Sequence, residues 1–211
     1  MANTNRPNGF MPVKHISGSP YNGQANFYSV ATDEGTAIFV GDLVKISGTS
    51  ANGYAGVSRG AANNVMVGVV VGVVPKGMDP VNGKMSTGSM ALDTPANRFV
   101  PATDGTVRYV MVCDDPEIVM EVQADDDTST VAAASVMANF NVIATAGTTT
   151  TGVSNMQLDS NTGNTTNTLP LQMIGWPNRV DNEVGVLNQK VLVKFNTHQY
   201  KATTGVTGTA V

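Results

Sequence analysis

The sequence predicts an all-β protein, a sandwich or barrel of short antiparallel strands with long loops and at most one short helix. Two observations indicate this fold class. Apolar and polar residues alternate over short runs, which is the period of a strand with one buried face. Charged residues make up only 13% of the 211 residues, about half the usual share. Thr, Asn, Ser and Gly replace them, and these residues favour strands and tight turns.

The clearest alternation lies in residues 107–113 and 118–122, which predict two strands. Asp114, Asp115 and Pro116 separate the two runs. Because proline cannot donate to a central ladder, we place it in a turn. The sequence therefore predicts a hairpin here.

Three further runs complete the strand assignment. Residues 190–195 predict a half-buried strand, and residues 36–47 predict two strands around a turn at Gly41 and Asp42. Residues 65–74 are almost continuously apolar, as in a strand buried on both faces. Gly68 and Gly72 within that run predict a close approach of another backbone or ring.

The chain divides into an extended N-terminal arm, residues 1–25, and a single β-rich domain, residues 26–211. The arm lacks any strand or helix period, so it cannot satisfy its own backbone polar groups. It lies either across its own domain or on a neighbouring subunit, and we favour the neighbouring subunit. A long exposed loop near residues 147–168, carrying a small strand, and one short helix at residues 128–137 are also predicted.

The charge pattern argues against nucleic-acid and membrane partners. The net charge is −4 and no basic run occurs, whereas nonspecific nucleic-acid binding needs clustered cations. The longest apolar run is about half of what a membrane helix needs, and residues 1–8 contain no apolar signal segment. Cys113 is the only cysteine, so it forms no intrachain disulfide, and we expect a small buried apolar residue.

No motif predicts catalysis, a metal site or a cofactor. Ser58 lies in a Gly-x-Ser-x-Gly match, but a nucleophile elbow needs a helix directly after the serine, and the next strand follows too soon. We expect a surface turn there. Residues 125–127 are three aspartates without the glycine or distal glutamate of a calcium loop. His15 and His198 have no neighbouring metal ligands. The sequence therefore predicts a protein that is not an enzyme.

Two signatures in the second half carry a family resemblance. They are RYVMVCDDPEIVMEVQ at residues 108–123, and VLVKFNTHQY at residues 191–200 followed by Thr204, Gly205 and Val206. The segments NRPNGF at residues 5–10 and SPYNGQ at residues 19–24 belong to the same pattern. Together these segments resemble capsid decoration, or cement, proteins of tailed bacteriophages.

The resemblance implies a structural virion protein made in the bacterial host cytoplasm. Such a protein sits on the outer capsid surface, binds the major capsid protein, bridges capsomers and stabilises the shell. Proteins of this kind are commonly homotrimers. On this basis we expect contacts with the capsid or with other subunits at seven residues of the arm and the C-terminal signature: Arg6, Phe10, Met11, His15, Tyr21, His198 and Tyr200.

Two alternatives remain open. β-Sandwiches also serve as carbohydrate-binding or host-adhesion modules, although these need an aromatic platform and only 6% of the residues are aromatic. A tail or neck component of a virion would have the same composition. Locating the protein on its particle would separate this possibility from decoration.

Overall fold

The computed structural model describes residues 3–80, 83–85, 97–125, 129–201, 204, 205 and 208. The regular secondary structure of these residues is nearly all β, which confirms the predicted fold class. The strands are β1 (Met11–His15), β2 (Asn26–Val30), β3 (Leu43–Ala51), β4 (Tyr54–Arg59), β5 (Gly68–Val73), β6 (Met78–Asp79), β7 (Lys84–Met85), β8 (Arg108–Cys113), β9 (Ile118–Gln123), β10 (Asn139–Ile143), β11 (Gln157–Asn164), β12 (Leu171–Gly175) and β13 (Lys190–Phe195).

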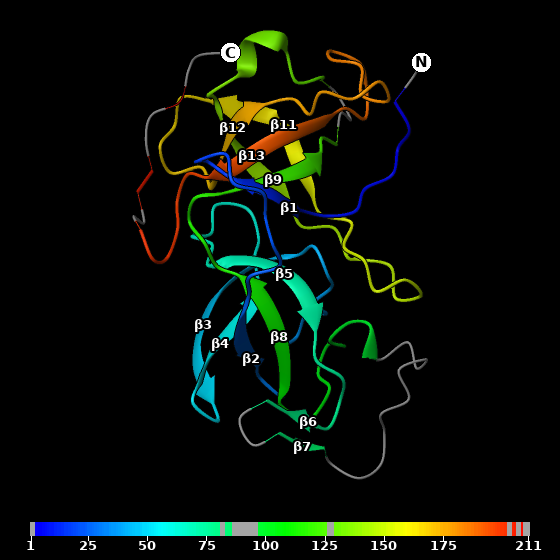
Figure 1. The fold of residues 1–211 in the computed structure, drawn as a ribbon, viewed down its shortest axis with the longest axis vertical. Helices are drawn as coiled ribbons and strands as arrows, with labels where there is room; N and C mark the ends of the chain where they lie inside the picture. The colour runs from blue at the N-terminus through cyan, green and yellow to red at the C-terminus, as the bar shows by residue number, and fades with distance from the viewer. Residues whose placement is uncertain are drawn as a thin grey trace.

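Two β units lie one above the other in Figure 1. The sheet unit is an antiparallel sheet in the order β1-β9-β13-β12-β10-β11, and the second unit is a closed barrel in the order β2-β4-β3-β5-β8. Only the β2–β4 pair of the barrel is parallel. The barrel is inserted between β1 and β9, which are neighbours in the sheet. Its two connections to the sheet unit are the chain after β1 and the segment between β8 and β9.

The two units share strands whose opposite faces belong to different hydrophobic cores. Val44, Val70 and Val112 point into the barrel core. Their chain neighbours Leu43, Val69 and Cys113 pack in the core of the sheet unit. Because successive strand residues face opposite sides, one barrel wall also serves as a wall of the other core.

The apolar run at residues 65–74 is explained by this arrangement. Met66 belongs to the core of the sheet unit and Val67 to that of the barrel, both without solvent exposure. A Cβ atom at Gly68 would lie 2.3 Å from the carbonyl oxygen of Cys113. The predicted close backbone approach is therefore present at Gly68.

The predicted hairpin at residues 107–122 is wrong. Its two strands exist, but β8 belongs to the barrel and β9 to the sheet unit. The turn between them is instead the crossing from one unit to the other. Asp115 shapes it by accepting the Glu117 backbone N–H at 2.8 Å. Alternation specifies the faces of a strand but not its partner, and that is why the prediction failed.

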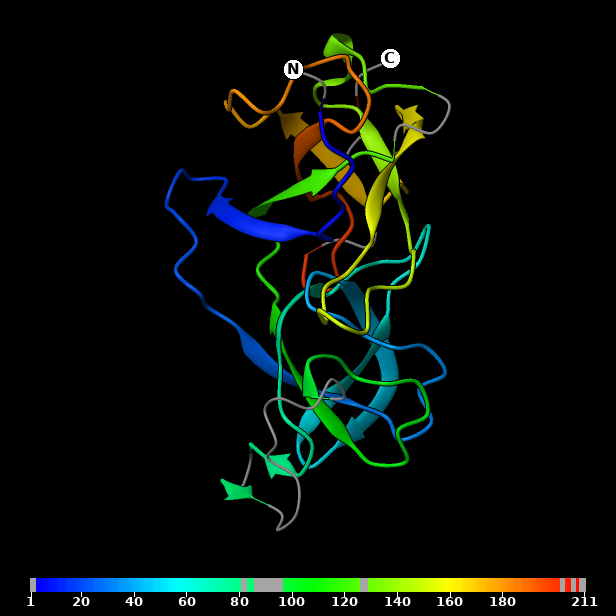
Figure 2. The same cartoon turned by 90° about the vertical axis from the view of Figure 1, so that its right-hand side faces the viewer.

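The N-terminal arm lies on its own chain, not on a neighbour as the sequence analysis favoured. β1 pairs with β9, and Phe10 is 1% exposed within the core of the sheet unit. The Arg6 backbone N–H donates to Oε1 of Gln123 at 2.8 Å. Figure 2 shows the arm descending along the sheet unit to the level where the barrel begins.

The polar stretch at residues 147–168 contains more structure than predicted. It carries the eight-residue strand β11 (Gln157–Asn164), in which Leu158 is the apolar core residue, and Met156 directly before the strand packs in the same core. The short helix predicted at residues 128–137 is reduced to the 3₁₀ turn η2 (Ala133–Ser135). Its expected capping residues 127 and 128 lie outside the described part. Val131 packs in the core of the sheet unit instead, and this burial is an alternative to a regular helix at these residues.

Replacing Phe10 tests the placement of the arm. Phe10→Ala should lower the free energy of unfolding by about 3–5 kcal/mol, because a buried aromatic ring leaves a cavity when removed. Met11→Ala is the matched control, since Met11 is 52% exposed and should change stability by at most about 0.5 kcal/mol. Urea unfolding followed by circular dichroism measures both. Equal stabilities of the two variants would contradict an arm packed on its own chain.

Candidate functional site

The junction between the two units gathers polar side chains from three distant parts of the chain. They come from the turn after β1, from the connection between β8 and β9, and from the segment that follows β13. After β13 the chain returns to the barrel, where the Gln199 backbone N–H donates to the Met66 carbonyl at 2.9 Å. The two predicted signature segments, residues 108–123 and 191–200, therefore meet here.

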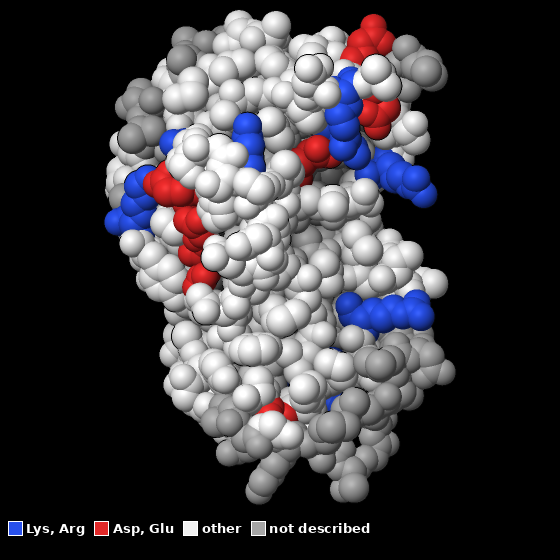
Figure 3. Space-filling view, viewed as in Figure 1, with Lys and Arg blue, Asp and Glu red and all other residues white. Residues whose placement is uncertain are grey.

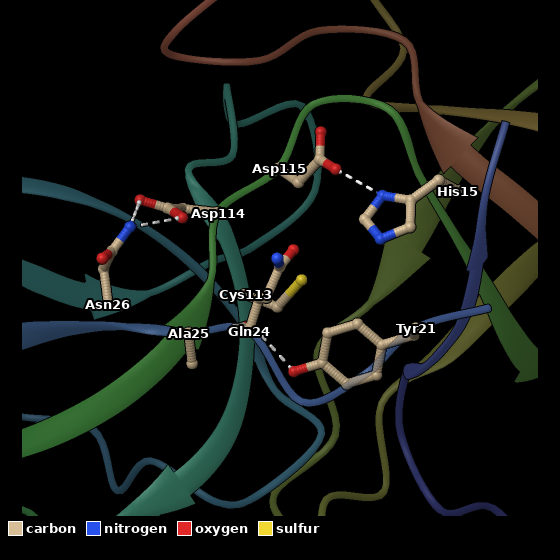
Figure 4. A pocket seen from close by; sticks show the side chains of 8 residues that line it. All are labelled: His15, Tyr21, Gln24, Ala25, Asn26, Cys113, Asp114 and Asp115. Carbon is tan, nitrogen blue, oxygen red and sulfur yellow. Dashed lines mark hydrogen bonds and ion pairs between the residues drawn. The ribbon is translucent and has the colours of Figure 1, made fainter. Parts of the chain in front are cut away.

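A hollow of about 390 Å³ opens at this junction. His15, Tyr21 and Asp115 line it from one side, as Figure 4 shows. Nδ1 of His15 lies 2.6 Å from Oδ2 of Asp115, so the arm is tied to the crossing segment. The Tyr21 hydroxyl donates to the Gln24 carbonyl at 2.9 Å, which fixes the chain on its way to β2.

Asp114 is the centre of a second set of hydrogen bonds. It accepts from the Asn26 amide at 3.0 Å and from the Tyr28 hydroxyl at 2.7 Å. The Tyr28 hydroxyl also lies 2.6 Å from the Tyr200 hydroxyl. Burial, followed by the contacts with Tyr200 and Asp114, raises the pKa of Tyr28. The phenol thus stays protonated and joins the barrel to the segment after β13.

His198 orients the end of that segment from a buried position. Its side chain is 1% exposed, its Nδ1 accepts the Tyr200 backbone N–H at 3.1 Å, and its ring meets Phe195 edge-on at 5.0 Å. Burial lowers the pKa of His198, although the Val67 backbone and two nearby aspartates favour its charged form. The imidazole is therefore a neutral hydrogen-bond acceptor near pH 7.

Cys113 lies in the wall of the same hollow, but its chemistry is that of a packed side chain. Burial raises the pKa of its thiol, and a protonated thiol is a poor nucleophile and a poor metal ligand. Tyr21 beside it has a pKa raised to about 12, mainly by burial. Within the described residues no three His, Cys, Asp or Glu side chains are grouped as metal ligands.

The barrel and the sheet unit meet at a second point, around Asp42, close to the N-terminal arm. Asp42 has no solvent exposure. Its carboxylate accepts from the Ser154 hydroxyl at 2.5 Å and from the Phe39 backbone N–H at 2.9 Å, and Arg59 Nε lies 3.5 Å away. Burial raises the pKa of Asp42 to about 6 despite these partners. The sequence predicted only a turn at this position.

The seven predicted contact residues separate into three groups. Arg6, Met11 and Tyr200 are exposed, so they remain accessible to a partner. His15 and Tyr21 line the junction hollow. Phe10 and His198 are each 1% exposed, which corrects their assignment as contacts with another molecule. Both side chains pack against other residues of the same chain.

Ser58 lies on strand β4, opposite Lys45 of β3. The predicted surface turn is therefore wrong, because the residue belongs to a regular ladder. Residues 61–64 after the strand form a turn and no helix. The strand-turn-helix geometry of a nucleophile elbow is not formed around this serine.

No protein-family model matches the chain, and the comparisons with curated proteins and with solved structures also give no match. In the part of the chain that the structure describes, no helix has the length and apolar character to cross a membrane. The junction geometry itself is thus the basis for a functional proposal.

His198 should make stability fall on acidification. The folded-state pKa is depressed below 6.5, so protonation favours the unfolded chain, and stability is lost as the pH falls through this range. Chemical denaturation at about pH 7.5 and about pH 5 should show a smaller loss for His198→Phe than for the unchanged protein. His15→Gln, which alters the other histidine, should retain the loss. An unchanged pH dependence in His198→Phe would contradict the assignment.

Asp42 should act in the opposite direction. Its folded-state pKa of about 6 exceeds the usual 3.8, so its contribution is most favourable below about pH 3.8 and is lost as the pH rises to about 6. Asp42→Asn should remove this pH-dependent contribution to the free energy of unfolding. The stability of the variant relative to the unchanged protein should rise by an amount on the order of 3 kcal/mol between about pH 4 and about pH 7, since one pKa unit corresponds to about 1.4 kcal/mol. A constant difference across this range would refute the prediction.

Proposed function

We propose that the chain is a structural virion protein that binds the outer surface of a bacteriophage capsid, bridges capsomers and stabilises the shell. Its partner would be the major capsid protein, and its working form a homo-oligomer, with a trimer favoured. The resemblance of residues 108–123 and 191–200 supports this proposal. The junction supports it as well, because these two segments form the connection that holds the sheet unit and the barrel together.

The observation that carries the proposal is that both units expose apolar side chains while the junction fixes their relative position. On the sheet unit, Met11 is 52% and Val13 42% exposed. On the barrel, Phe27 of β2 is 39% exposed. Large apolar side chains of this kind are typical anchors of protein interfaces. Two anchored units at a fixed distance suit a protein that spans two neighbouring subunits.

The remaining surface also suits extensive contact. Figure 3 shows one face of the molecule, on which uncharged residues predominate and most of the charged residues lie in the upper half of the view. Removing charged groups from water is costly unless they are well paired. A surface of Thr, Asn and Ser can be covered by a partner at lower cost and still forms hydrogen bonds. Several weak contacts made at once would then give strong overall binding.

Carbohydrate binding is the second candidate, and one cluster on the barrel favours it. Tyr54 lies between Phe27 and Tyr109, with ring centroids 6.1 Å and 5.8 Å away and both pairs edge-on. An exposed Phe27 ring supported by two tyrosines could stack against the apolar face of a sugar. This function predicts that a glycan array identifies ligands whose binding Phe27→Ser abolishes, without any virion being involved.

The test of decoration is to locate the protein on purified particles. Mass spectrometry of banded virions should find it in amounts comparable with the major capsid protein, and cryo-electron microscopy should place it on the outer shell. Particles lacking the protein should regain resistance to heat when it is added back. Detection in a few copies at one vertex would favour a neck or tail component, and absence from the particle would refute the proposal.

Surface variants then test the two anchors. Met11→Ser and Phe27→Ser should each weaken binding to such particles by about tenfold or more, as the loss of an interface anchor does. Met137→Ser is the matched control, since Met137 is 42% exposed and follows η2, at the end of the sheet unit away from the barrel (Figure 1). Unfolding curves should coincide for all three variants. Equal binding by all three would contradict a two-anchor contact.

A further inference from the structure

Three hollows lie beside the N-terminal arm and share lining residues, and together they are called the arm groove below. The first, of about 490 Å³, includes Asn8 and Met11 in its lining. A small notch of about 10 Å³ is lined by the same two residues together with Arg6 and Lys190. Arg6, Asn8 and Lys190 then line the third hollow, of about 510 Å³. Residues of the arm thus contribute to the lining of all three hollows.

The end of the groove nearest the barrel is apolar. Phe10, Met11 and Pro12 line it from the arm, and Val70 and Val71 line it from β5. Met11 is the exposed member of this wall, at 52%. An apolar side chain placed here would be removed from water on several sides, which is the main source of affinity at such sites.

The other end is polar, and its lining cations are Arg6 and Lys190. Its carboxylates are Glu121 and Asp181, and both are held by Arg179, at 2.9 Å and 3.2 Å. Lys190 lies 3.6 Å from the same Glu121. Arg6 is exposed, and no described carboxylate lies within ion-pair distance of its guanidinium. A carboxylate of a partner would complete this end, because guanidinium groups bind carboxylates through paired hydrogen bonds.

We propose that the arm groove binds an extended protein segment that carries apolar side chains at one end and a carboxylate at the other. The apolar end covers Met11 and the valines of β5, and the carboxylate contacts Arg6. An extended occupant beside residues 6–12 would have about the same length, roughly seven residues. This proposal depends on the proposed function in one respect only: if the chain decorates a capsid, the bound segment belongs to the shell subunit.

The charge asymmetry favours this occupant over others. Nucleic acid would need several clustered cations along the groove, and half of its length is apolar. A membrane surface would need several outward apolar side chains, whereas Met11 is the one exposed apolar residue among Phe10, Met11 and Val70 of this lining. A second copy of the chain would have to supply the same apolar and acidic segment, and its binding would depend on protein concentration.

A random peptide library displayed on phage provides the test without any knowledge of the source. Selection on the purified full chain should enrich peptides that share apolar residues followed or preceded by Asp or Glu. For one resynthesised, fluorescently labelled peptide, Arg6→Gln should weaken binding by about tenfold and Met11→Glu should abolish detectable binding. Replacing the acidic residues of the peptide by Asn or Gln should reproduce the effect of Arg6→Gln.

Val184→Glu is the matched control, because Val184 is 45% exposed and does not line the groove. It should leave peptide binding unchanged. Enrichment without acidic residues, or binding that is insensitive to Arg6→Gln and Met11→Glu, would overturn the proposal. Self-association that disappears in the same two variants would identify a second copy as the occupant and would also overturn it.

The two proposals can fail separately. Peptide binding requires no virion, so it would persist if the protein proved absent from particles. Conversely, Arg6→Gln that decorates particles as well as the unchanged protein would refute the arm groove as the docking site and leave capsid decoration in place.

Discussion

The buried contact between Asp42 and Ser154 is the constraint on which the arrangement of the two units depends. Asp42 belongs to the barrel side and Ser154 to the connection between β10 and β11 of the sheet unit. Their side chains meet at 2.5 Å with no solvent exposure. An unpaired buried carboxylate oxygen is costly, and Ser154 is the Asp42 partner that comes from the sheet unit, so this contact favours the observed relative position of the two units.

The arm is held by the same contact point. The Phe10 backbone N–H donates to the Gly41 carbonyl at 2.9 Å, one residue before Asp42. Gly9 has a φ of +68°, and a Cβ atom there would lie 2.5 Å from both the Gly41 oxygen and the Ser154 Cβ. Only glycine fits this crossing. The close approach turns Phe10 into the core and leaves Met11 at the surface, where the arm groove begins.

The sequence allowed the strands to be predicted but not their partners. In residues 108–113, Val110 and Val112 enter one core and Cys113 the other, so both faces are apolar. That pattern indicates a strand between two cores and could have argued against a hairpin with β9. A small strand was predicted at β11, but its length was underestimated for the opposite reason, since Ser160, Thr162 and Asn164 continue the strand with polar side chains. Strand pairing there is set by β10 and by the bridge between Ala124 and Leu158, and both partners lie outside the segment, so its local composition does not indicate them.

Part of the junction could be predicted from the sequence, but the buried contacts of Asp42 could not. His15, Tyr21, His198 and Tyr200 were singled out, and they do lie where the two signature segments meet. An aspartate after glycine usually belongs to an exposed turn, so nothing local indicated that Asp42 is buried. Its partners Arg59 and Ser154 come from distant segments. Because both contact points act on the arm, one through His15 and the other through Gly41, the surface formed by Arg6 and Met11 is positioned by the junction and not by the arm alone.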